Sequence, residues 1–71
     1  MATRYEIEVD MIAMPLADIV SEISRLETRL GFKTLNFRRS GATVAVYEID
    51  REIDANRLPA YMTFRQITSR R

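Results

Sequence analysis

The stretch PLADIVSEISRLETRLG, residues 15–31, decides the fold of this 71-residue chain. Its apolar residues recur at the three- and four-residue spacing that lines one face of a helix. They are Leu16, Ile19, Val20, Ile23, Leu26 and Leu30. Pro15 suits the first helical position, and Gly31 suits the left-handed position just past the helix end. We therefore expect one amphipathic helix that packs its apolar face on the rest of the chain.

Before this helix, residues 4–9 alternate between apolar and charged side chains. One side carries Tyr5, Ile7 and Val9, and the other carries Arg4, Glu6 and Glu8. A period of two with one apolar side predicts a half-buried strand.

The connector Met11-Ile12-Ala13-Met14 joins this strand to the helix and contains no polar residue. It therefore offers no Ser, Thr, Asp or Asn to cap the helix start. Two interpretations stay open. The methionines fill gaps over the end of the core, or Met11, Ile12 and Met14 form an exposed apolar patch for a partner.

After the helix, residues 33–39 and 42–49 are expected to form a β-hairpin with Ser40-Gly41 as its turn. A two-residue turn puts four apolar side chains on one face, namely Leu35, Phe37, Val44 and Val46. It puts Arg38 and Tyr47 on the opposite face, where they meet water or a partner.

Residues 50–57 are short and acidic, and we expect Asp50 to cap a helical turn or two that ends before Pro59. Residues 61–67 are interpreted as the last strand. Its expected inward side chains are Met62 and Phe64, and its expected outward ones are Tyr61, Thr63 and Arg65. We expect a single domain over residues 1–67 and a frayed tail over residues 68–71.

The expected element order is strand, helix, strand, strand, short helix, strand. A split β-α-β arrangement places the third strand between the first two and the fourth strand outside the first. This predicts an α+β domain with a four-stranded antiparallel sheet, the main helix on one face and the other face open. The order resembles the ferredoxin-like fold with its second helix truncated, and that fold serves many unrelated functions.

The composition argues against several classes of function. The chain has no cysteine and no histidine, which removes disulfides, thiolate metal sites and the commonest transition-metal ligand. Its net charge of +1 gives no global attraction to nucleic acid or membrane. No apolar run approaches the ~20 residues that span a bilayer, and the first residues lack a signal-peptide pattern. We expect a cytoplasmic protein without a cofactor, a metal or a membrane partner.

No set of catalytic residues is recognisable. Ser21 and Ser24 have no histidine or other evident base to activate them. The acids Glu6, Glu8 and Asp10 share one side of the first strand, where they are typical of a solvated face, although carboxylates in a row also suit Mg²⁺ or Ca²⁺. We therefore expect no enzyme.

The preferred hypothesis is a protein-binding module, such as a small accessory subunit, adaptor or inhibitor of a larger assembly. It would bind a copy of itself, as a homodimer, or another protein through the open sheet face or an unpaired strand edge. Tyr and Arg are the residue types that anchor interfaces. The candidate partner-binding residues are Tyr47, Tyr61, Glu6, Glu8, Arg38 and Arg65.

The alternative hypothesis is a small RNA- or DNA-binding domain. Tyrosines on the open face would stack on bases, and arginines would contact phosphates. The acidic first strand counts against it, because Glu6 and Glu8 repel a phosphate backbone.

Overall fold

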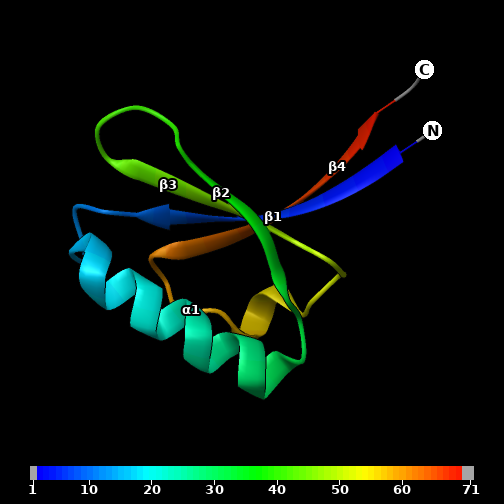
Figure 1. The fold of residues 1–71 in the computed structure, drawn as a ribbon, viewed down its shortest axis with the longest axis horizontal. Helices are drawn as coiled ribbons and strands as arrows, with labels where there is room; N and C mark the ends of the chain where they lie inside the picture. The colour runs from blue at the N-terminus through cyan, green and yellow to red at the C-terminus, as the bar shows by residue number, and fades with distance from the viewer. Residues whose placement is uncertain (1, 70–71) are drawn as a thin grey trace.

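The computed structural model describes residues 2–69 (Figure 1). Its elements in chain order are β1 (Ala2–Asp10), α1 (Leu16–Leu30), β2 (Thr34–Arg39), β3 (Val44–Ile49), the 3₁₀ turn η1 (Ala55–Arg57) and β4 (Met62–Ser69). This order confirms the expected sequence of strands and helices, with the second helix reduced to η1.

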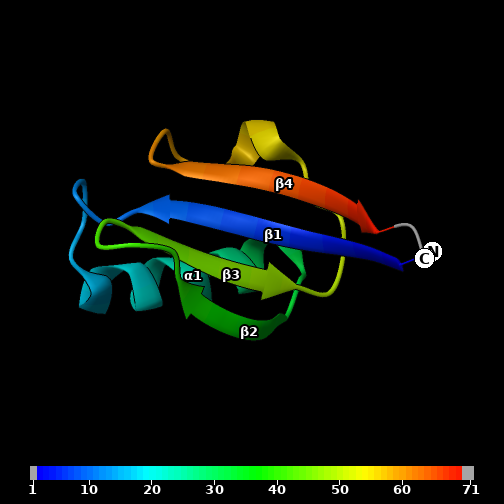
Figure 2. The ribbon, with the colours of Figure 1, turned by 90° about the horizontal axis from the view of Figure 1, so that it is seen from above.

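The four strands form one antiparallel sheet in the order β2-β3-β1-β4. The predicted strand order is therefore confirmed, and the fold is α+β of the ferredoxin-like type. Figure 2 looks onto the open face of the sheet, with α1 behind it and η1 on the β4 side. The β1–β4 ribbon extends past β3, because β3 pairs with β1 only from Tyr5 onward.

The core lies between α1 and the sheet. The pleat of β1 sends Ile7 and Val9 into this core and turns Glu6 and Glu8 to the opposite face, as the alternation predicts. Met62 of β4 is also buried there, and Phe64 packs against it. β2 is the exception, because it contributes no fully buried residue.

Helix α1 begins and ends where the sequence indicates. No side chain caps its start, and Gly31 ends it in the left-handed conformation with φ 77°. Its buried residues are Ile19, Ile23 and Leu26. Leu16 and Val20 were expected on the buried face but are exposed, because the apolar stripe is wider than the contact with the sheet. Among residues 2–69, no helix combines the length and hydropathy of a membrane-crossing segment.

The predicted hairpin register is wrong. Phe37 lies opposite Tyr47 rather than Val44, so β3 is displaced by three residues. The loop is longer than two residues, and Ser40 N–H donates to the Val44 carbonyl at 2.8 Å. A displacement by an odd number moves every β3 side chain to the other face of the sheet. Val46 therefore lies on the open face, and Tyr47 faces α1.

Two expectations about the C-terminal third also change. Asp54, not Asp50, caps η1, and its side chain accepts a hydrogen bond from Asn56 N–H at 3.0 Å. Strand β4 runs through Ser69, two residues beyond the expected strand end at Ile67. The rest of the expected tail, Arg70 and Arg71, lies outside the described residues.

The packing of α1 predicts a sharp contrast between two substitutions in its middle. Ile23→Ala removes a side chain that is 4 % exposed and is expected to cost about 2–5 kcal/mol of unfolding free energy. Ser21→Ala on the exposed side is expected to stay within about 0.5 kcal/mol of the original. Thermal or urea melts measure both, and equal losses would mean that α1 is rotated about its axis.

Candidate docking surfaces

An ion pair occupies the centre of the open sheet face, which is the face that α1 does not cover. Glu6 of β1 is 1 % exposed although no helix covers it. Arg38 reaches from β2 across β3 and donates to Glu6 Oε2 at 2.9 Å and to Oε1 at 3.4 Å. It passes over Val46, its cross-strand partner, which is also buried. The hydrogen bond and the charge of Glu6 raise the pKa of the Arg38 guanidinium above its ordinary value.

A second ion pair lies beside the first. Arg65 of β4 bonds to Glu8, and both side chains are partly exposed. Glu6, Glu8, Arg38 and Arg65 therefore lie together on the open face, as the sequence predicts. Their charges, however, are already satisfied by one another rather than left for a partner.

Tyr47 is not on the open face, which corrects its expected place. It is 6 % exposed and belongs to the core beneath β3. Its ring packs against Phe37 with a centroid separation of 4.9 Å. Burial raises the pKa of the Tyr47 hydroxyl. The physical cause of the error is the three-residue displacement of β3, which exchanges its two faces.

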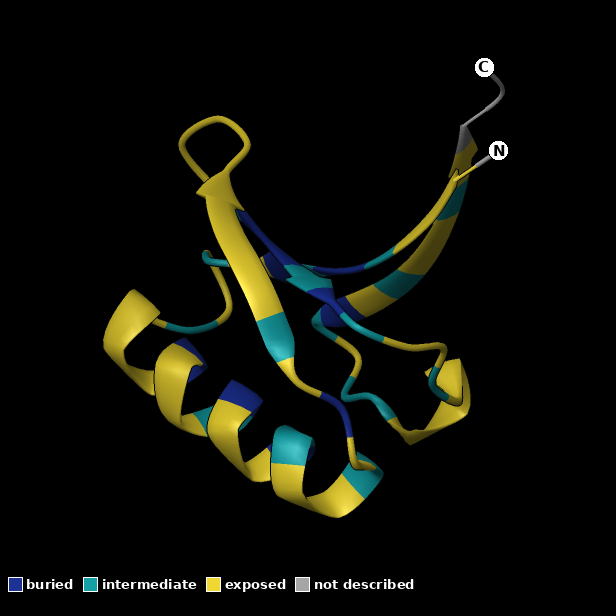
Figure 3. Ribbon diagram, turned by 45° about the vertical axis from the view of Figure 1, so that its right-hand side comes forward, coloured by how far each residue is buried: buried dark blue, intermediate teal, exposed yellow. Residues whose placement is uncertain are grey.

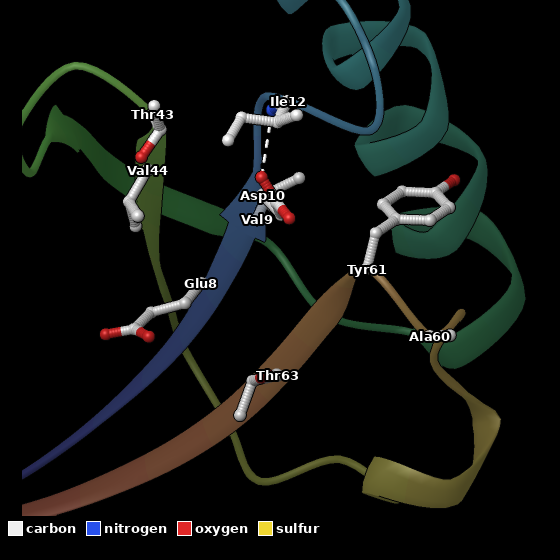
Figure 4. A pocket seen from close by; sticks show the side chains of 9 residues that line it. All are labelled: Glu8, Val9, Asp10, Ile12, Thr43, Val44, Ala60, Tyr61 and Thr63. Atoms are coloured by element: carbon white, nitrogen blue, oxygen red, sulfur yellow. Dashed lines mark hydrogen bonds between the residues drawn. The ribbon is translucent and has the colours of Figure 1, made fainter.

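Tyr61 was expected to point outward from the last strand, but it precedes β4 and packs against the core. Figure 4 shows its ring directed toward α1. Its hydroxyl lies 3.5 Å from Glu22 Oε2 on that helix. Partial burial, followed by the Glu22 charge, raises the pKa of Tyr61.

The aromatic side chains all belong to the helix side of the sheet or to the loops beneath it. Tyr5 stacks on Phe64 with ring centroids 6.1 Å apart, and both pack against the core. Phe32 lies in the core itself. Within residues 2–69 the open face thus carries no aromatic ring, which removes the tyrosine platform that both functional hypotheses placed there.

A shallow hollow of about 380 Å³ opens at the end of β1 (Figure 4). Glu8 and Asp10 line it, but Glu8 pairs with Arg65, and Asp10 Oδ1 accepts Ile12 N–H at 2.9 Å. Residues 2–69 contain no group of acids close enough together to hold a metal ion. Of the two acids in the hollow, Glu8 is thus paired, and Asp10 is a single carboxylate without an ion pair among the described residues.

Each of the two interpretations of the apolar connector holds for some of its residues. Met11 and Met14 are half-buried and pack against the core, as gap-filling methionines do. Ile12 between them is 78 % exposed. Only Ile12 thus contributes to an exposed apolar patch.

The large hydrophobic side chains that the described structure leaves exposed lie on β2, the start of α1 and the connector before it. We name the four on β2 and α1 the β2-side surface: Leu16, Val20, Leu35 and Phe37. The fifth, Ile12, lines the hollow at the end of β1 together with Ala60 and Tyr61. Figure 3 shows β2 and α1 together at the front of the molecule, with β2 mostly exposed.

The flank of α1 that carries Leu16 and Val20 is the flank next to β2. Glu27 lies two turns after Val20 on this flank, and its Oε2 accepts Thr34 N–H at the start of β2 at 2.9 Å. Sequence reasoning missed this surface because it assigned all four residues to the inward, apolar sides of the helix and the hairpin.

Comparison of the chain with protein-family models, with curated proteins and with solved structures found no match.

The burial of the Glu6–Arg38 pair predicts which substitutions on the open face lower the melting temperature most. Arg38→Met leaves Glu6 buried without its partner and is expected to lower the melting temperature more than Arg65→Met, whose partner Glu8 is partly exposed. The double variant Glu6→Gln with Arg38→Met is expected to recover most of the loss, because no buried charge remains. Equal melting temperatures for the two single variants would contradict the ion pair's role.

Proposed function

We propose that this chain is a non-enzymatic protein-binding module that docks a larger protein against its β2-side surface. Such a chain acts as an accessory subunit, adaptor or inhibitor. The observation that carries the proposal is the gathering of four of the five exposed large hydrophobics along one strand edge and the helix flank beside it. Single exposed apolar residues are ordinary on a protein surface, but a grouped set marks an interaction site.

The side-chain chemistry of this surface indicates the kind of partner it fits. Phe37 and Val20 offer apolar contact, and Val20 is 57 % exposed. Lys33 and Arg39 flank β2 at its two ends, and no ion pair engages either within the described part of the chain. A complementary partner presents an apolar patch with acidic residues at its rim.

The open face is the weaker docking candidate. Its central carboxylate is already bound by Arg38, and breaking a buried pair to engage a partner is costly. It also lacks the aromatic side chains that stack on bases. These features support the β2-side surface over the open face and support a protein partner over nucleic acid.

Quantitative affinity capture from a native lysate tests the proposal. Val20→Asp and Leu35→Glu are each expected to weaken capture of the partner at least tenfold, because a charge replaces apolar contact. Both side chains are exposed, so the melting temperature is expected to change little. The partner is identified by mass spectrometry, and the affinity of the purified pair is then measured directly.

Ser21→Asp is the matched control, because it adds the same charge one residue from Val20 on the exposed side of α1. It is expected to bind the partner normally. If Val20→Asp and Leu35→Glu retain full affinity for the purified partner while Glu8→Lys loses it, the docking surface is the open face and the proposal fails.

A further inference from the structure

The two edge strands of the sheet, β2 and β4, differ in which hydrogen-bond partners their outward backbone N–H groups have. At the β2 edge the chain's own side chains accept three N–H groups. Asp50 Oδ1 accepts Lys33 N–H at 2.9 Å, Glu27 Oε2 accepts Thr34 N–H at 2.9 Å, and Asn36 Oδ1 accepts Phe37 N–H at 2.8 Å. β2 also carries an irregular register between Thr34 and Asn36. Side-chain caps and a bulge both discourage the addition of another strand.

The first of these caps persists over a wide pH range. The bond from Lys33 N–H, followed by the Arg51 guanidinium, holds the pKa of the Asp50 carboxyl below its usual range. A lowered pKa keeps the carboxylate charged above that value, so the cap is lost only as the pH falls through it.

The β4 edge has a different arrangement. Asp10 N–H donates to the Tyr61 carbonyl at 2.9 Å, which sets the alternation of the β1–β4 ladder. By that alternation, the backbone groups of Phe64, Gln66 and Thr68 point away from β1. Met62 points the same way, but its N–H already donates to the Pro59 carbonyl at 3.0 Å. Within residues 2–69 no hydrogen bond is formed by the other three N–H groups across this edge.

We propose that this edge pairs with the β4 strand of a second copy of the chain, joining two sheets into one of eight strands. The pairing is antiparallel, is related by a two-fold axis and is centred on Gln66. In this register Gln66 lies opposite Gln66 of the second copy, and Phe64 lies opposite Thr68. Each such pair exchanges two backbone hydrogen bonds. The interface is isologous, which is the commonest form of a homodimer.

The charged side chains of β4 do not oppose its pairing with a second copy. Its one ionic side chain within Met62–Ser69 is Arg65, and Glu8 of the same chain already neutralises it. The centred register places Arg65 opposite Ile67 of the second copy, so two arginines do not face one another. The β2 edge differs, because Lys33 and Arg39 flank it and no ion pair within the described residues engages either of them, and like charges protect an edge from self-pairing.

The shape of the molecule leaves this part of β4 accessible. In Figure 2, η1 lies beside the middle of β4, and Pro59, which follows η1, accepts the Met62 N–H at the start of the strand. The second half extends with β1 beyond β3, and its last residues pair with Ala2 and Thr3. A register centred on Gln66 therefore leaves the hydrogen bond between Met62 and Pro59 in place. It also leaves the β2-side surface on the opposite edge free for a different protein.

Sedimentation equilibrium of the full chain from about 1 to about 300 μM tests the pairing, because small interfaces associate in this range. The mass is expected to rise from monomer toward dimer. Gln66→Lys places two ammonium groups opposite each other and is expected to weaken association at least tenfold. Asn36→Lys, an equivalent change on the β2 edge, is expected to leave the dimer intact.

Hydrogen exchange provides the second readout. The amides of Phe64, Gln66 and Thr68 are expected to exchange more slowly as the concentration rises, whereas Met62 N–H stays unchanged. A chain that stays monomeric to the highest concentration would overturn the pairing. So would a dimer that survives Gln66→Lys but is lost with Val20→Asp, because the copies would then meet through the β2-side surface.

Discussion

The ion pair between Glu6 and Arg38 determines what the rest of the sheet surface can do. It spans three strands, from β2 across β3 to the central β1, and it buries a carboxylate on a face that no helix covers. The stem of Arg38 shields Val46, so the middle of this face is closed by the chain itself. Glu8 and Arg65 are also paired, so the four charged groups at the centre of this face engage one another. Interaction surfaces must then be sought at the edges and along the helix.

Much of the fold could be predicted from local patterns, because each depends on neighbours in sequence. The alternation in β1, the helical period of α1 and the left-handed Gly31 each concern a few consecutive residues. The strand order follows from the handedness of the split β-α-β unit. The register of β3 could not be obtained in this way. Apolar residues lie on both faces of β3. The sequence from Val44 to Tyr47 therefore does not show which face packs in the core.

The candidate site was predicted only in part for the same physical reason. Glu6, Glu8 and Arg65 lie on the open face because one side of β1 and of β4 is clearly the core side. Arg38 lies there because it alternates with Phe37 along β2. The two tyrosines moved to the helix side, one through the register of β3 and the other because Tyr61 lies outside the strand. The exposure of Leu16 and Val20 depends on how far the sheet extends over α1. The caps on β2 come from Glu27 and Asp50, which lie well before and after that strand.

Photocross-linking in a native lysate shows which surface of the chain the partner contacts. A benzophenone side chain is placed at Val20, on the β2-side surface, or at Thr63, an exposed open-face position on β4. The account predicts that the partner cross-links at Val20 and not at Thr63. Products with a second copy of the chain are recognised by their mass and set aside. Cross-linking of the same partner at Thr63 but not at Val20 would contradict the account, because the partner would then lie on the face that the Glu6–Arg38 pair closes.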